Sequence, residues 1–393
     1  MKYFFSFSIC LFLVLNTCAQ GSWSQKASFN ASGRSRAAGF TIGAKAYIGT
    51  GWDAANTVLQ DFWEWDQSTD TWTQKANFDG GPRRNAVGFS IGTKGYFSTG
   101  HDGGNHVQDL WEWDQSTNTW SQKTNFPAAS RQEAAGFSIG TKGYVGTGWD
   151  GTLYRDFWEW NQLTNTWTQM ADFVGTPRSS AVAFSIGVKG YIGTGYDNTY
   201  TKDFWEWDQA TNIWTQMADF GGSARASATG FSIGAKSYIG IGIDSNGRQQ
   251  DFWEWDTATN TWAQMTNFSG VARNEVVGFS IGAYGYIGTG LDGSNYYQDF
   301  WEFTTSSVGI IENKTTSFIV YPNPSNGSFI VKSEHSKTIK EIQIRDLLGN
   351  VIIQQHSDDL ASVNIMNVPV GIYLLAIVDQ HNRTTYQKIE ICH

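Results

Sequence analysis

Short runs of alternating apolar and polar residues fill the chain from about residue 22 to residue 303. The string Asp-Phe-Trp-Glu-Trp-Asp recurs almost unchanged, and its alternation places successive side chains on opposite faces of a strand. Its copies begin at Asp61, Asp109, Asp156, Asp203, Asp251 and Asp299, with a spacing of 47 or 48 residues. No helical periodicity competes with this pattern. We therefore predict an all-β chain that contains six copies of one unit.

A second string, Gly-Phe-Ser-Ile-Gly-x-Lys-Gly-Tyr-Ile-Gly-Thr-Gly, keeps step with the first. It predicts two strands joined by a tight turn, in which glycine supplies the positive φ angles of a hairpin. Turn residues such as Ser-Thr-Asn-Thr then separate the Phe-Trp-Glu-Trp strand from a fourth strand that carries a tryptophan. Each unit is thus a four-stranded meander, and six such units predict a six-bladed β-propeller.

The tryptophan of the fourth strand shows how the ring closes. It is present at Trp72, Trp120, Trp167, Trp214 and Trp262, but it is missing after the last Phe-Trp-Glu string. The missing copy lies near the N-terminus, as Trp23. We expect the segment around Trp23 to pair with residues 299–303 and to complete the sixth blade, which removes an exposed sheet edge.

The repeated units resemble kelch repeats. The family pattern is a hydrophobic strand that ends in glycines, then a strand with spaced aromatic residues, then a tryptophan; here it reads Tyr144-Val-Gly-Thr-Gly148, Trp158-Glu-Trp160 and Trp167. The resemblance covers about residues 20–303 and implies a propeller similar to the central domain of galactose oxidase. Gly-Thr-Gly replaces the adjacent glycine pair of the family, which leaves the kelch subtype open.

Residues 1–19 have the pattern of a signal peptide. Lys2 supplies a positive start, and the apolar run from Phe4 to Leu15 is too short to span a membrane. The small residues Thr17 and Ala19 predict cleavage between Ala19 and Gln20. The alternative is lipidation at Cys18, whose preceding residues resemble a lipobox. We expect no transmembrane segment in the mature chain.

The repeat stops after Phe303, and the polar segment 304–316 predicts a linker. Residues 317–393 then alternate as the strands of a small β-sandwich. This part resembles the type A C-terminal sorting domain of the type IX secretion system of Bacteroidota, through the motif residues Tyr321, Pro322, Asn323, Pro324, Gly327, Gly349, Gly371 and Tyr373. The resemblance implies the type IX translocon as a partner and a secreted or outer-membrane surface location. The alternative is an ordinary adhesive sandwich domain.

Composition narrows the picture further. Once the signal peptide is removed, Cys392 is the one remaining cysteine, so disulfides do not hold the fold. Stability must come from burial, and all 19 tryptophans precede position 302. A net charge of −9 argues against nucleic acid as a partner. We expect a monomer without a cofactor.

Ligand sites are expected on the face formed by the loops between blades and the loops between the second and third strands, because these segments vary among the repeats. An arginine lies five residues before each Gly-Phe string, at Arg34, Arg83, Arg131, Arg178, Arg225 and Arg273. Such a ring would hold a carboxylate or sulfate. The alternative, favoured here, is that these arginines tie neighbouring blades through backbone carbonyls or the repeated acids.

A second set of candidate ligand contacts precedes the repeated aspartate of the loop between the second and third strands: Trp52, His101, Trp149 and Tyr196. Aromatic rings of this kind stack on sugars. Packing between blades is an equal alternative. The sequence therefore favours a surface or secreted binding protein for a glycan or another surface protein.

Two enzymatic alternatives and one structural alternative remain to be weighed. The repeated acids are not expected to be catalytic, because Asp109 and Glu112 have counterparts in nearly every blade, whereas a catalytic pair is unique. A copper site like that of galactose oxidase fails for lack of cysteine in the propeller. A sugar-modifying activity like that of the sialic-acid epimerases of the kelch type survives, although no blade stands apart in the repeat. The third possibility is a structural surface module. We expect no metal site and no catalytic residue.

Overall fold

The structure is a computed structural model that describes residues 21–305, 318–321, 325, 328–333, 339–346, 350–360, 362–365, 368–369, 371–379 and 384–391. The chain divides into two compact units, Met1–Thr305 and Ser306–His393. The predicted signal peptide and its cleavage site at Ala19 and Gln20 lie outside the described residues, as does most of the predicted linker. Among the described residues, we find no helix with the length and apolar character needed to cross a membrane.

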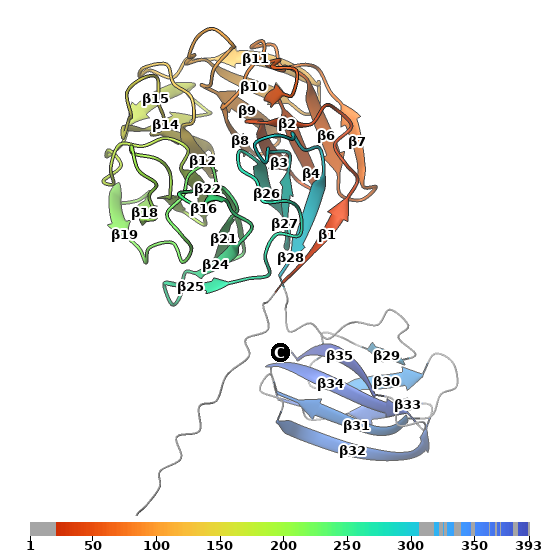
Figure 1. Cartoon of the computed structure of the whole chain (residues 1–393). Coiled ribbons are helices and arrows are strands. Elements are labelled where there is room, and N and C mark those ends of the chain that lie inside the picture. Colours follow the sequence, from red (N-terminus) through yellow and green to blue (C-terminus); the bar gives the residue numbers. More distant parts are fainter. Residues whose placement is uncertain are drawn as a thin grey trace, which may run out of the picture. The chain divides into compact units, whose positions relative to one another are not determined.

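The described part of the first unit, residues 21–305, contains six four-stranded antiparallel sheets arranged around an axis (Figure 1). Blade 1 consists of β3 (Ala38–Ile42), β4 (Lys45–Gly49), β6 (Phe62–Asp66) and β7 (Thr71–Gln74); blade 2 of β8 (Val87–Ile91), β9 (Lys94–Ser98), β10 (Leu110–Asp114) and β11 (Thr119–Lys123); blade 3 of β12 (Ala135–Ile139), β13 (Lys142–Gly146), β14 (Phe157–Asn161) and β15 (Thr166–Gln169). Blade 4 consists of β16 (Val182–Ile186), β17 (Lys189–Gly193), β18 (Phe204–Asp208) and β19 (Ile213–Gln216); blade 5 of β20 (Thr229–Ile233), β21 (Lys236–Gly240), β24 (Phe252–Asp256) and β25 (Thr261–Gln264). The predicted six-bladed propeller is confirmed.

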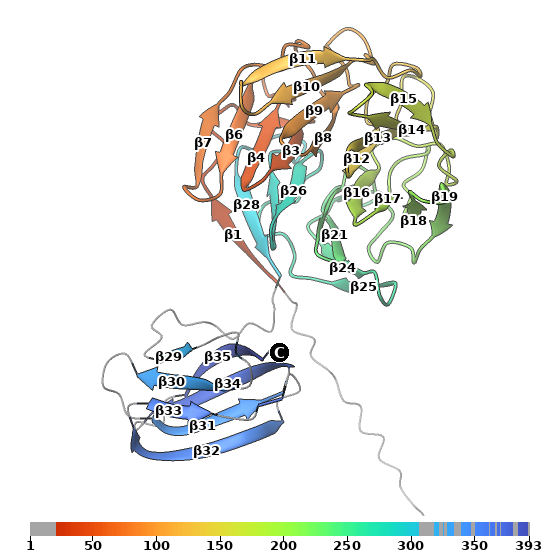
Figure 2. The ribbon, with the colours of Figure 1, turned by 180° about the vertical axis from the view of Figure 1, so that it is seen from behind.

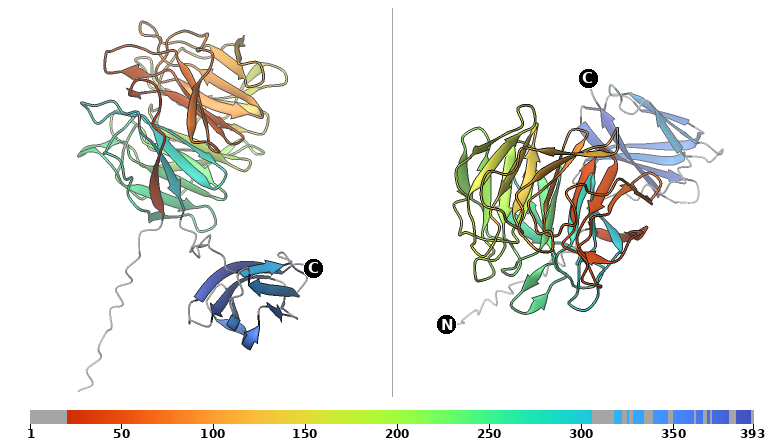
Figure 3. Two further views of the ribbon diagram at one scale, coloured as in Figure 1. Left: turned by 90° about the vertical axis from the view of Figure 1, so that its right-hand side faces the viewer. Right: turned by 90° about the horizontal axis from the view of Figure 1, so that it is seen from above.

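Blade 6 closes the ring with the N-terminal strand. It consists of β26 (Val277–Ile281), β27 (Tyr284–Gly288), β28 (Phe300–Thr304) and β1 (Ser22–Lys26). Strand β1 pairs antiparallel with β28, with Trp23 opposite Phe303. Figures 1 and 2 show β1 in red beside β28 in cyan, and the left view of Figure 3 shows the same neighbours from the side. The closure predicted from the displaced tryptophan is confirmed.

Aromatic side chains hold neighbouring blades together. Trp113 of blade 2 is fully buried, and its ring centroid lies 4.7 Å from that of Tyr47 and 5.2 Å from that of Phe62 in blade 1. Glycine lets Phe40 of blade 1 approach blade 2 closely, because a Cβ on Gly95 would lie 1.9 Å from Cζ of Phe40. Large aromatic side chains bury roughly 150–250 Å² each, so these interfaces stabilise a propeller whose residues 21–305 contain no cysteine.

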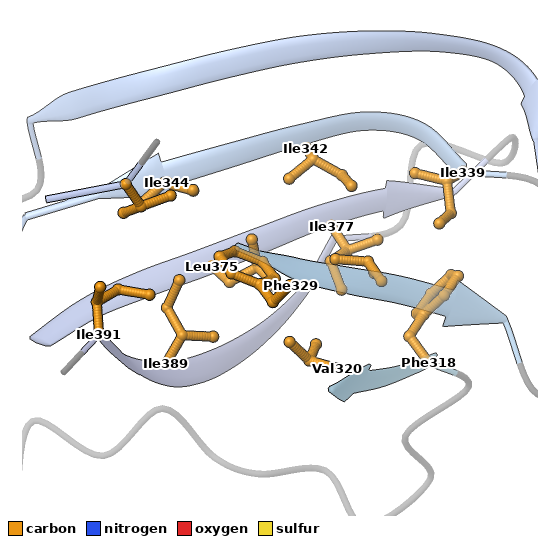
Figure 4. Packing of buried hydrophobic residues seen from close by; sticks show 12 residues of the cluster. Phe318, Val320, Phe329, Ile339, Ile342, Ile344, Leu375, Ile377, Ile389 and Ile391 are labelled. Carbon is orange, nitrogen blue, oxygen red and sulfur yellow. The ribbon is translucent and has the colours of Figure 1, made fainter. Parts of the chain in front are cut away.

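The described part of the second unit contains two sheets. One consists of β29 (Phe318–Tyr321), β30 (Phe329–Ser333) and β33 (Ser362–Ile365); the other of β32 (Val351–Leu360), β31 (Ile339–Arg345), β34 (Gly371–Asp379) and β35 (Thr384–Ile391). Apolar side chains such as Phe329, Ile342 and Ile377 are buried between the sheets (Figure 4). The predicted small β-sandwich is confirmed.

Candidate functional site at the channel mouth

Two kinds of loop share one face of the propeller. The interblade loops join the fourth strand of one blade to the first strand of the next, and the b–c loops join the second and third strands. In blade 1, β2 (Arg34–Ser35) pairs with β5 (Trp52–Asp53), and single backbone bridges join Arg84 to His101 and Gln132 to Trp149 in the next two blades. The two loop types therefore lie side by side, as the sequence predicted.

The six repeated arginines are buried within these loops. Each is at most 1% exposed, and each guanidinium donates to a backbone carbonyl on the next blade. Each also forms two hydrogen bonds with the first aspartate of the repeated string, at distances between 2.5 and 3.0 Å. The pairs are Arg34 with Asp61, Arg83 with Asp109, Arg131 with Asp156, Arg178 with Asp203, Arg225 with Asp251 and Arg273 with Asp299.

The backbone of each arginine is hydrogen-bonded to one blade, and its side chain is hydrogen-bonded to the next blade. The amide nitrogen of Arg83 donates to the carbonyl of Leu59, and its carbonyl accepts from Gly51, both in blade 1, while its side chain binds Asp109 in blade 2. The arginines thus tie neighbouring blades. These contacts agree with the interpretation that the sequence favoured, and a buried guanidinium in a bidentate pair offers little surface to an anionic ligand.

Two residues beyond each arginine, the backbone forms a closed circle around the axis. Its members, here called the mouth ring, are Arg36, Asn85, Glu133, Ser180, Ser227 and Glu275. Each backbone N–H donates to the carbonyl of the preceding member, with N···O distances of 2.9 to 3.2 Å. All six have φ between 50° and 58°, a left-handed conformation that costs a non-glycine residue roughly 1–2 kcal/mol. Glycine would avoid this cost, yet all six positions carry other residues. This marks the ring as a candidate site.

The blades carry different side chains in the mouth ring. Arg36 forms a bidentate ion pair with Glu275, at 2.7 and 3.0 Å. On the other side of the ring, Glu133 accepts hydrogen bonds from Ser180 at 2.8 Å and from Asn85 at 3.3 Å. These side chains line a cavity of about 140 Å³. The repeat predicted blades that are alike, but the mouth ring is asymmetric. Some blades contribute a positive side chain, others a negative one, and others a neutral one.

Arg84 adds a cation beside the ring. Its guanidinium lies 4.5 Å from the ring centroid of Trp52, which Arg36 also contacts at 4.9 Å. Within residues 21–305 of the structure it has no ion pair, and its buried Nε has no hydrogen-bond partner. Burial, followed by the charge of Arg36, lowers the pKa of Arg84. The equivalent residues of other blades are uncharged, so this is a partly desolvated cation on one side of the mouth; the charges of Glu275 and Glu133 oppose the fall of its pKa, but neither forms an ion pair with it.

The aromatic candidates differ in exposure. Trp52 lies under two arginines, and its buried Nε1 has no partner among the described residues. His101 contacts His106 with ring centroids 5.0 Å apart, and burial, then the charges of Arg84 and His106, lower the pKa of His101. Trp149 and Tyr196 are 37% and 41% exposed. Trp149 and Tyr196 are thus the candidates with free ring surface.

Sequence reasoning missed the mouth ring and Arg84. The signal was present, because the two positions after each repeated arginine read Ser-Arg, Arg-Asn, Gln-Glu, Ser-Ser, Ala-Ser and Asn-Glu. Variation at a fixed place in a near-identical repeat indicates a position that the fold does not dictate. The invariant arginines, by contrast, stand at positions that the fold does dictate. No group of His, Cys, Asp or Glu that fits a metal ion occurs among the described residues.

In the second unit, Tyr321 is 44% exposed at the end of β29, and Tyr373 packs against the apolar core. Gly371 begins β34. The other predicted motif residues, Pro322, Asn323, Pro324, Gly327 and Gly349, lie outside the described residues.

Comparisons with known proteins agree with both units. Residues 319–391 match the family described as secretion system C-terminal sorting domain. A solved structure titled "Structure of YjhT" matches with a TM-score of 0.63 and 16% identity, over 72% of this chain and 97% of that chain. A search of the curated proteins finds no match. Since 601 solved chains match in all, the fold by itself selects no activity. The chain thus combines a six-bladed propeller fold with a C-terminal part that matches a secretion system sorting domain, which indicates export to the cell surface or the medium.

Proposed function

We propose that the protein is a secreted or cell-surface binding protein whose propeller takes an acidic saccharide at the mouth of its channel. The observation that carries this proposal is Arg84, a cation without an ion pair in the described propeller, which adjoins Asn85 of the mouth ring and lies over Trp52, whose buried Nε1 also lacks a partner. A partly buried cation without a carboxylate partner is costly, and an anionic ligand group would supply that partner.

The rest of the site fits a saccharide better than other anions. Asn85, Ser180 and Glu133 bring hydroxyl, amide and carboxylate groups to the cavity, which suit sugar hydroxyls. Trp149 and Tyr196 expose ring faces on the surrounding loops. A cavity of about 140 Å³ accepts a single small group, so a protein partner would have to insert one side chain rather than dock a flat surface.

The test is binding of the purified protein to an array of acidic and neutral glycans. The wild type is compared with Arg84→Gln and with Arg155→Gln, a matched control at an exposed arginine of a b–c loop. We expect acidic glycans to bind the wild type and the control. Arg84→Gln should lower their affinity at least tenfold, because one charge-assisted hydrogen bond contributes about 1.4 kcal/mol. Equal binding by all three proteins contradicts the proposal. A blank array favours a protein partner or a structural surface module.

The second candidate is a sugar-modifying enzyme of the kind found on other kelch rings. The observation in its favour is the asymmetry of the mouth, where the Arg36–Glu275 pair and Glu133 place an arginine and acids near the axis. Proton NMR of an acidic amino sugar with the protein tests this candidate. Faster interconversion of its anomers or epimers, abolished by Glu133→Gln, supports the enzyme; unchanged rates support a binding protein.

A further inference from the structure

A groove lies between the b–c loops of blades 3 and 4, outside the mouth ring. Its volume is about 460 Å³. Trp149 and Leu153 of blade 3 form one wall, Asp197 and Asn198 of blade 4 form the other, and Pro177 of the interblade loop lies between them. No cation is among the residues that line this described groove.

The groove begins where the mouth ends. Trp149 exchanges two backbone hydrogen bonds of 3.0 Å with Gln132, the residue before Glu133 of the mouth ring. On the facing blade, Tyr196 is bridged in the same way to Ser179, the residue before Ser180. Since Ser180 and Glu133 are hydrogen-bonded to each other at the mouth, the two walls diverge from one point of the ring. Both walls of the groove are therefore hydrogen-bonded to residues adjacent to the mouth ring, which places the groove next to the mouth.

The walls of the groove have the chemistry of a sugar site. Trp149 is 37% exposed and, unlike Trp52, has no arginine over its ring among the described residues. The ring of His106 packs against it at nearly a right angle, with centroids 5.5 Å apart. An aromatic ring fixed in this way offers an apolar face to the C–H groups of a pyranose.

The opposite wall supplies the polar contacts. Burial raises the pKa of Asp197, but hydrogen bonds from Thr176 and Thr199 outweigh it and leave the pKa below its ordinary value. The carboxylate is thus a fixed, ionised acceptor, held at 2.7 Å by the hydroxyl of Thr176. The carboxamide of Asn198 has no hydrogen bond within residues 21–305 of the structure. A fixed carboxylate and a free carboxamide suit neutral hydroxyl groups and repel a second anion.

We infer that the ligand is an oligosaccharide of at least two residues, in which an acidic sugar occupies the mouth and an uncharged sugar lies in the groove on Trp149. This inference rests on the proposed function, and it adds the length and the charge order of the ligand. A saccharide with a second acidic residue is excluded from the groove by Asp197.

The test uses four probes with the purified full chain in isothermal titration calorimetry. They are glucuronic acid, glucuronic acid linked to N-acetylglucosamine, galacturonic acid and digalacturonic acid. We expect the neutral second residue to raise affinity about tenfold over glucuronic acid, the 1.4 kcal/mol that one stacked ring supplies, and the acidic second residue to raise it by less than threefold.

Variants assign the gain to the groove. Trp149→Ala and Asn198→Ala each lower the affinity for the mixed disaccharide toward that for glucuronic acid, and Trp149→Tyr restores most of it. Leu291→Ala, at the position equivalent to Trp149 in blade 6, leaves both affinities unchanged. Melting curves show that the variants are folded.

The outcomes separate the two proposals. If Arg84→Gln weakens all probes while Trp149→Ala and Asn198→Ala change nothing, the groove inference is wrong and the mouth proposal stands. If Arg84→Gln changes no affinity and the groove variants weaken binding of the disaccharide, the mouth proposal is wrong. The inference is then wrong in its charge order, because no acidic sugar is bound at the mouth. If no probe binds, both are overturned as stated.

Discussion

Replacing Arg178 with leucine tests whether the repeated arginines are structural ties between blades. Arg178 is 1% exposed and donates to both carboxylate oxygens of Asp203, at 2.5 and 2.7 Å, and to the carbonyl of Thr194 at 2.9 Å. Leucine fills part of the volume but leaves the carboxylate of Asp203 without its cation. The free energy of unfolding must therefore fall.

The magnitude follows from burial. Removing one partner of a buried ion pair costs about 3–5 kcal/mol, because the other charge stays behind. The side chain of Asp203 is 24% exposed and keeps a hydrogen bond from Trp205, so water and this donor take up part of the charge. We expect a loss at the lower end, about 3 kcal/mol. Arg178→Lys keeps the positive charge but not the bidentate geometry, so the free energy of unfolding should fall by about half as much.

The assay is urea denaturation followed by tryptophan fluorescence, with the free energy of unfolding taken from the midpoint and slope. Arg155→Leu, at an exposed arginine, is the matched control and should change stability by less than about 0.5 kcal/mol. A loss below about 1 kcal/mol for Arg178→Leu refutes the reasoning, because a surface pair contributes no more than that. The arginines would then regain their place as ligand candidates.

Further predictions concern the closure, acid stability and export. Trp23→Ala removes ring contacts with Phe303 and other side chains of blades 5 and 6. The free energy of unfolding should fall by about 2–3 kcal/mol, which lowers the melting temperature by several degrees. An unchanged melting temperature contradicts closure by β1. Burial raises the pKa of Asp61 but the Arg34 ion pair outweighs it, so the net shift is downward and the pair stabilises the fold above pH ~4. The stability difference between wild type and Asp61→Asn, from urea denaturation at several pH values, should therefore shrink as the pH falls below ~4, and a constant difference contradicts this. Deleting residues 317–393 should retain the protein inside the cell envelope in fractionation experiments; normal secretion contradicts the sorting role.

The fold could be predicted from the sequence because it is repeated. Six copies of one pattern average out local ambiguity, and the displaced Trp23 fixes the closure without any structural information. The C-terminal sandwich was predictable for another reason, since its apolar residues alternate along short strands, as Ile342 and Ile344 do on β31.

The candidate site could not be predicted in the same way. Arg36 and Glu275 are separated by 239 residues and meet across the seam of the ring, so their pairing depends on closure and on the left-handed backbone at both positions. The cover over Trp52 depends on Arg84, one residue beyond an invariant arginine, whereas Trp149 in blade 3 is 37% exposed. Repeats predict what the blades share, whereas a site is made from what they do not share.

A structure of the protein bound to its tightest acidic saccharide tests the central claim most directly. The account predicts that the acidic group lies within hydrogen-bonding distance of Arg84, with the sugar over the mouth ring and the next residue directed toward Trp149. A saccharide bound on the outer strands or on the opposite face, with the mouth unoccupied, would contradict it.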